Sequence, residues 1–128
     1  MGVRATVLKI VVRSKKDADA VKAMLRIHYP SWEVDMATLH GARQLESALR
    51  ELEDIITSDS FVILMLGRED VELAEELRRV LPPNVAVHVV PRARIRNTRV
   101  EHLAREFAKA RAKLRLGARW LREAGVYR

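Results

Sequence analysis

Basic side chains, above all arginines, are the residues of this sequence whose type and spacing suggest a function. Residues 91–128 contain 12 Lys and Arg but only three acidic residues, whereas residues 1–90 contain 12 Lys and Arg and 14 Asp and Glu. Arg92, Arg94 and Arg96 occupy alternate positions, so in an extended segment their guanidinium groups project to one side. Arginine binds phosphate through paired hydrogen bonds. The pattern therefore predicts contact with a polyanion, DNA or RNA.

Side chains that commonly catalyse reactions form no recognisable motif in this chain. The sequence has no cysteine, and its four histidines show no metal-ligand spacing. No serine lies in a nucleophile-elbow motif, and no glycine-rich loop ends in Gly-Lys-Ser/Thr. His88 alternates with valines, so we expect a structural histidine or one at the edge of a sheet. We expect no catalytic residue and no cofactor.

The first 90 residues alternate short β-branched runs with helical patterns, which is typical of βαβ units and a parallel sheet. Ser14 is predicted to cap the first helix, with Asp17 three residues on in a capping-box-like arrangement. Strands are predicted at about 5–12, 32–39, 61–66 and 85–90, and helices at about 15–28, 42–57 and 69–80.

The basic segment is predicted to be largely helical. Residues 91–96 form a loop, and Thr98 with Glu101 forms a second capping box. This box opens a helix that runs to about residue 116, followed by a Gly117 cap and a short helix at 118–124. One face of the long helix is apolar, so we expect it to pack on the rest of the protein. The residues of this face are Val100, Leu103, Phe107, Ala110 and Leu114.

These elements predict one domain over residues 1–128, a three-layer α/β/α fold with a four-stranded, mainly parallel sheet and a basic C-terminal helix. An α/β core spans 1–90, and the helical extension 91–128 packs on it. No apolar run reaches the roughly 18 residues that a membrane span needs, and no secretory signal is present. We therefore expect a cytoplasmic protein with no membrane partner. The charged content of 32%, with one Gln and two Asn, resembles heat-adapted proteins.

In an open parallel sheet, ligands bind at the carboxyl ends of the strands. Each predicted strand is followed there by a loop with at least one cation, and three of these loops lead into helix N-termini, which suit phosphate groups. We predict that these loops and the basic helix form one phosphate-binding surface. The predicted nucleic-acid-binding residues are Arg13, Lys15, Lys16, Arg43, Arg68, Arg92, Arg94, Arg96, Arg99 and Arg105.

The order of elements and three segments in residues 5–90 resemble the Toprim domain of topoisomerases, primases and related nucleases. Residues 9–17, KIVVRSKKD, resemble its first strand and turn. Residues 37–45, ATLHGARQL, resemble the glycine-containing turn after its second strand. Residues 62–70, VILMLGRED, take the place of the strand leading to its Asp-x-Asp motif. The resemblance implies an α/β fold that acts on nucleic acid.

The chain departs from the Toprim pattern at the acidic residues. Arg13 and Ser14 stand where the family has an acidic residue followed by glycine, and Glu69 and Asp70 are adjacent rather than alternate. A magnesium site needs several carboxylate oxygens around one cation, and Arg13 would place a positive charge there. We therefore predict a non-catalytic Toprim-like protein. Glu69 and Asp70 are weak candidate metal ligands and better candidates for helix N-terminal charges.

Other readings of the sequence stay open. One is a metal-dependent phosphoryl-transfer enzyme or nuclease that binds Mg²⁺ through Glu69, Asp70 and a third carboxylate such as Asp35. Another is a protein-interaction subunit, or a homodimer, that docks through its C-terminal helix. The basic helix also fits a solvated face or a surface for an acidic protein.

Overall fold

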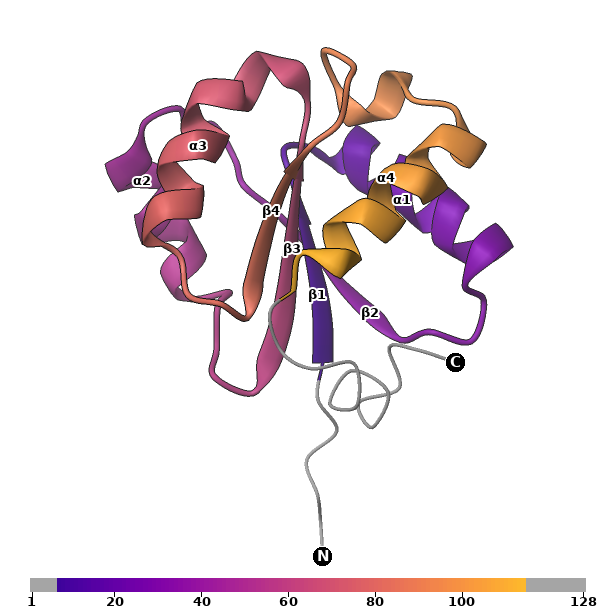
Figure 1. Ribbon diagram of the computed structural model, residues 1–128, viewed down its shortest axis with the longest axis horizontal. Coiled ribbons are helices and arrows are strands. Elements are labelled where there is room, and N and C mark those ends of the chain that lie inside the picture. Colours follow the sequence, from indigo (N-terminus) through magenta and orange to yellow (C-terminus); the bar gives the residue numbers. More distant parts are fainter. Residues whose placement is uncertain (1–6, 115–128) are drawn as a thin grey trace, which may run out of the picture.

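The computed structural model describes residues 7–114 and contains a single four-stranded sheet flanked by four α-helices (Figure 1). The strands are β1 (Val7–Val12), β2 (Val34–Thr38), β3 (Ser60–Leu66) and β4 (Val85–Val89). The α-helices are α1 (Lys15–His28), α2 (Leu45–Glu53), α3 (Val71–Val80) and α4 (Val100–Ala112), and two short 3₁₀ helices are η1 (Arg68–Asp70) and η2 (Ile95–Asn97). The element order confirms the predicted α/β fold.

All strand pairs of the sheet are parallel, in the order β2-β1-β3-β4. Ile10 of β1 pairs with Met36 of β2 on one side and Ile63 of β3 on the other. All seven residues of β3 are buried, as expected for a central strand covered on both faces. β4 is an edge strand, so the predicted edge position of His88 is confirmed.

The helices form a layer on each face of the sheet, with α1 and α4 on one side and α2 and α3 on the other (Figure 1). Alternate residues of β3 enter the two cores. Phe61, Ile63 and Met65 pack with α1 and α4, whereas Val62, Leu64 and Leu66 pack with α2 and α3. Among residues 7–114, no helix combines the length and apolar character that crossing a membrane requires.

The structure corrects the bounds of the second helix, which is shorter at both ends than the predicted 42–57. Side chains from other segments hydrogen-bond to the backbone just outside each end of the helix. Arg13 donates to the carbonyl of Ala42 before α2, and Lys9 Nζ donates to the carbonyl of Ile55 after it, at 2.8 Å. Gly41, at φ +61°, makes the left-handed turn between β2 and this segment.

The predicted capping box at Thr98 and Glu101 is wrong. Arg99 is the N-cap residue of α4, and no side-chain hydrogen bond caps this helix. Thr98 instead ends η2, where its N–H donates to the carbonyl of Ile95. The Thr98 Oγ1 atom is buried and has no hydrogen-bond partner within the described part of the chain.

The packing face of α4 agrees with the sequence prediction. Leu103, Phe107, Ala110 and Leu114 are buried against the core shared with α1. The helix ends at Ala112 rather than near residue 116. The predicted Gly117 cap and the short helix at 118–124 lie outside the described residues.

Candidate functional site

The carboxyl ends of the parallel strands lie at one edge of the sheet, where four loops converge (Figure 1). The loops comprise residues 13–14, 39–44, 67–70 and 90–99. The connections from β1 and β3, which are neighbours in the sheet, lead to helices on opposite faces. This is the topological switch point at which open α/β sheets bind ligands. The loops chosen from the sequence therefore belong to one region.

Arg13 lies at the centre of this region and bonds to two of the neighbouring loops. It follows β1, and its guanidinium donates to the carbonyls of Leu39 and Ala42 and forms an ion pair with Asp70 at 3.4 Å. Its side chain is 14% exposed. Three of the four loops are joined by this one residue. The Arg13 side chain is thus held by partners inside the protein.

Two carboxylates are buried beside Arg13. Burial raises the pKa of Asp70 above its ordinary 3.8, and the charge of Arg13 opposes that rise. Burial likewise raises the pKa of Asp17, and a hydrogen bond with Ser14 and the charge of Arg94 oppose it. The Ser14 hydroxyl accepts the N–H of Asp17 at 3.2 Å, so the predicted Ser14 cap is confirmed.

The basic loop after β4 is anchored through its backbone. A carboxylate oxygen of Asp17 accepts the N–H of Arg96 at 3.0 Å. The N–H of Arg68 donates to the carbonyl of Arg92 at 2.6 Å. Because the main chain makes these contacts, the side chain of Arg92 stays exposed, whereas that of Ile95 is buried in the core.

Most of the predicted nucleic-acid-binding side chains are exposed around these loops. Arg94 forms a half-exposed ion pair with Glu69 at 3.4 Å, and Arg96 is half-buried. The exposed residues are Lys15, Lys16, Arg43, Arg68, Arg92, Arg94, Arg99 and Arg105.

A hollow of about 290 Å³ lies between the loop after β4 and helix α4. Its basic lining residues are Arg92, His102, Arg105 and Lys109. Thr98, whose buried hydroxyl lacks a partner in the described chain, also contributes to its wall. The hollow thus links two predicted residues, Arg92 and Arg105, with a lysine of the same helix.

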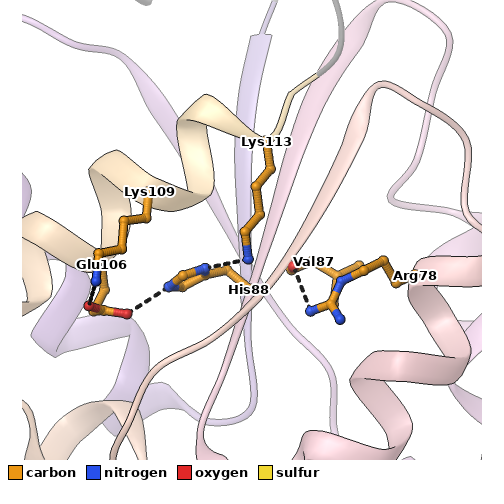
Figure 2. Close-up of polar contacts among 6 residues, drawn as sticks. All are labelled: Arg78, Val87, His88, Glu106, Lys109 and Lys113. Carbon is orange, nitrogen blue, oxygen red and sulfur yellow. Dashed lines mark hydrogen bonds and ion pairs between the residues drawn. The ribbon is translucent and has the colours of Figure 1, made fainter.

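A second polar cluster escaped the sequence analysis. His88 of β4 is 5% exposed and lies between two side chains of the α4 segment (Figure 2). Its Nε2 is 2.8 Å from Glu106 Oε1, and its Nδ1 is 2.8 Å from Lys113 Nζ. Lys109 donates to the other oxygen of Glu106 at 3.1 Å. The sequence signal for this cluster was Glu106, a charged residue on the side of the helix that is otherwise apolar.

Within residues 7–114, the two aromatic residues considered for stacking on bases make contacts inside the protein. Tyr29 and Trp32 pack edge-on against Phe107, with ring centroids 5.3 and 5.9 Å away. The guanidinium of Arg111 covers both rings, at 5.5 and 5.2 Å from their centroids. These contacts favour recognition of phosphate over recognition of bases.

The carboxylates considered for a metal site do not come together. Within residues 7–114, no group of three or more His, Asp or Glu side chains is arranged to hold a metal ion. Asp35 lies in β2, three residues before the end of the strand, where its backbone is in register with Lys9 of β1. Asp70 is paired with Arg13, and Glu69 with Arg94. The third ligand suggested from the sequence is therefore wrongly placed.

Comparisons with protein-family models, curated proteins and solved structures gave no match to this chain.

Proposed function

We propose that this protein is a non-catalytic, Toprim-like protein that binds the phosphate backbone of DNA or RNA. The observation that carries the proposal is the basic hollow between the loop after β4 and α4, at the edge of the sheet where the other cationic loops lie. Guanidinium groups there contact phosphate oxygens, while Arg13 and Asp17 position the loops from inside. Within residues 7–114, Tyr29 and Trp32 pack on Phe107, so we expect binding that does not depend on sequence.

The two alternatives have less support. A metal-dependent nuclease needs converging carboxylates, but Asp70 is neutralised by Arg13 and Asp35 lies too far from the edge. A subunit that docks through the apolar face of its C-terminal helix needs that face exposed. In α4 this face is buried in the protein's own core.

The proposal predicts salt-sensitive binding that depends on the loop arginines. Charge reversal of Arg92, Arg94 and Arg96 to Glu should weaken binding of random-sequence DNA and RNA alike. The plot of log K against log salt has a slope of about −0.9 per phosphate contact. We therefore expect the loss of three contacts to make this slope less steep by about 2 to 3. Fluorescence anisotropy of labelled single- and double-stranded oligonucleotides over a salt series measures this change.

The matched control is charge reversal of Lys22, Arg26 and Arg79, which are exposed on α1 and on the last turn of α3, away from these loops. It changes the net charge equally and should leave most of the binding intact. Chelation of divalent ions should have no effect on affinity. Equal losses in the two triple variants would show that net charge alone, and not this surface, causes binding.

A further inference from the structure

Lys113 directly follows α4, and its amine lies against the buried pair formed by His88 and Glu106 (Figure 2). The Nζ atom is 2.8 Å from His88 Nδ1, and His88 Nε2 is 2.8 Å from a Glu106 oxygen. His88 and Glu106 are 5% and 8% exposed, whereas Lys113 is exposed. The Lys113 amine is thus accessible from the surface, whereas His88 and Glu106 are buried beside it.

The hydrogen bonds determine the proton positions on His88. A lysine amine donates, so Nδ1 accepts, and a carboxylate accepts, so Nε2 carries the hydrogen. Burial lowers the pKa of His88 below its ordinary 6.5, which keeps the ring neutral. His88 therefore presents a basic nitrogen to the Lys113 amine while Glu106 orients the ring from the other side. Nucleophiles in proteins are activated by this order of groups.

The Lys113 side chain borders a groove of about 810 Å³ along the outer edge of β4. Volumes of this order suit small molecules. Arg78 and Arg79, from the last turn of α3, line the same groove. Arg78 also donates to the carbonyl of Val87 at 3.2 Å, so it closes part of the open edge of the strand (Figure 2). The groove thus combines an amine with two guanidinium groups that favour an anionic molecule.

We propose that Lys113 is a nucleophilic amine that forms a Schiff base with small aldehydes or ketones carrying a phosphate or carboxylate group. The neutral Nζ attacks the carbonyl carbon, and His88 Nδ1 accepts the proton that the amine loses. The carbonyl oxygen takes a proton from water and becomes a hydroxyl. His88 gives its proton to that hydroxyl, which leaves as water as the C=N bond forms, and the imine nitrogen then returns its remaining proton to the solvent. One carbonyl compound and one amine thus give one imine and one water, with no oxidant or reductant.

The charges around Lys113 favour its neutral form. Burial lowers the pKa of Lys113 below its ordinary 10.5, and the nearby Arg78 and Lys109 add to this effect. Glu106 opposes it. Lys109, one turn earlier, instead donates directly to Glu106. The two lysines therefore differ in their hydrogen-bond partners, which provides an internal comparison.

The experiment uses pyridoxal 5′-phosphate, an aldehyde with a phosphate group, on the full chain at pH 7.5. Sodium borohydride reduces the imine to a stable amine, and peptide mass spectrometry gives the labelling rate of each lysine. We expect Lys113 to react at least about tenfold faster than Lys109 or the exposed Lys22, because only Lys113 has a base positioned to accept its proton. Equal rates at the three lysines in the unmodified protein would overturn the proposal without any variant.

Two variants test the parts of the site. His88→Gln should slow labelling of Lys113 and leave Lys22 unchanged, because only Lys113 loses its base. Arg79→Gln should slow labelling by pyridoxal 5′-phosphate but not by pyridoxal, which lacks the phosphate. Circular dichroism confirms that each variant is folded. If folded His88→Gln protein labels Lys113 at the original rate, His88 is not the base and the proposed mechanism fails.

Discussion

Two pairs of buried polar side chains each join segments that are distant in the sequence. Arg13 and Asp70 join the loops after β1 and β3, and His88 and Glu106 join β4 to α4. A buried polar group is costly unless it is hydrogen-bonded, so removing one partner exposes the full cost of the other. The edge strand β4 therefore depends on His88 being neutral and bonded on both ring nitrogens.

This dependence predicts that stability falls in mild acid. Burial lowers the pKa of His88 in the folded state, so the unfolded chain binds a proton first as the pH drops. The contribution of His88 is complete above the unfolded value of 6.5 and is lost as pH falls from there toward the folded pKa. Urea denaturation at pH 8.0 and pH 5.5 should show a lower free energy of unfolding at pH 5.5.

The variants His88→Gln and His102→Gln separate this effect from other titrations. His102 is exposed, so its replacement should preserve the pH dependence, whereas His88→Gln should flatten it. Neither histidine contacts Asp17 or Asp70, so the titration of these carboxylates cancels in the comparison. The same slope in the two variants would exclude His88 as its source.

At the scale of elements, the loop after β4 is positioned by a close approach to the end of β3. Gly67 lies so near this loop that a Cβ atom would be 2.1 Å from the carbonyl oxygen of Ala93. The adjacent N–H of Arg68 donates to the carbonyl of Arg92. The absence of a side chain at Gly67 thus allows the basic loop to lie on the sheet edge.

Gly67→Ala should therefore displace the basic loop and destabilise the protein by about 1–3 kcal/mol, as overpacking does. We also expect weaker oligonucleotide binding, because the displaced loop carries Arg92 and Arg94. Urea denaturation and anisotropy measure the two effects.

The control is Gly41→Ala, where a Cβ would have no atom within 4 Å but φ is +61°. It should cost about 1 kcal/mol through backbone strain alone and leave binding unchanged. Binding by the Gly67→Ala protein as tight as that of the Gly41→Ala protein would contradict the positioning role of this contact.

At the scale of the whole molecule, α4 is an integral part of the fold. It covers one face of the sheet beside α1, and Phe107 is fully buried between them. The basic loop and helix are therefore held in a fixed place relative to the other strand-end loops. A charge asymmetry along the sequence becomes a defined cationic region of the folded protein.

Phe107→Ala should lower the free energy of unfolding of the whole domain by about 3–5 kcal/mol, because it leaves a cavity beneath α4. Ile27→Ala, at a position 65% exposed, should change it by no more than about 0.5 kcal/mol. Far-ultraviolet circular dichroism and tryptophan fluorescence should report one shared transition. Separate transitions would show that α4 unfolds independently of the sheet.

Local patterns determined the class of fold and the order of its elements. The continuous apolar run of β3, the Ser14 cap and the apolar face that contains Leu103 and Phe107 depend on residues close in sequence. Their periodicity is set by the backbone geometry of strands and helices. The loops at the carboxyl edge followed from this order, because parallel strands end together.

Tertiary structure alone decided the partners of polar residues. Arg13 turned inward to carbonyls 26 and 29 residues away, Thr98 lost its predicted cap, and His88 met Glu106 and Lys113. The second helix is shorter than its local pattern predicts, and Lys9 and Arg13 bond to the backbone on either side of it. Such contacts join residues far apart in the chain, so no local period records them. The physical reason is that a buried polar group takes whichever partner the packed elements bring within hydrogen-bond distance.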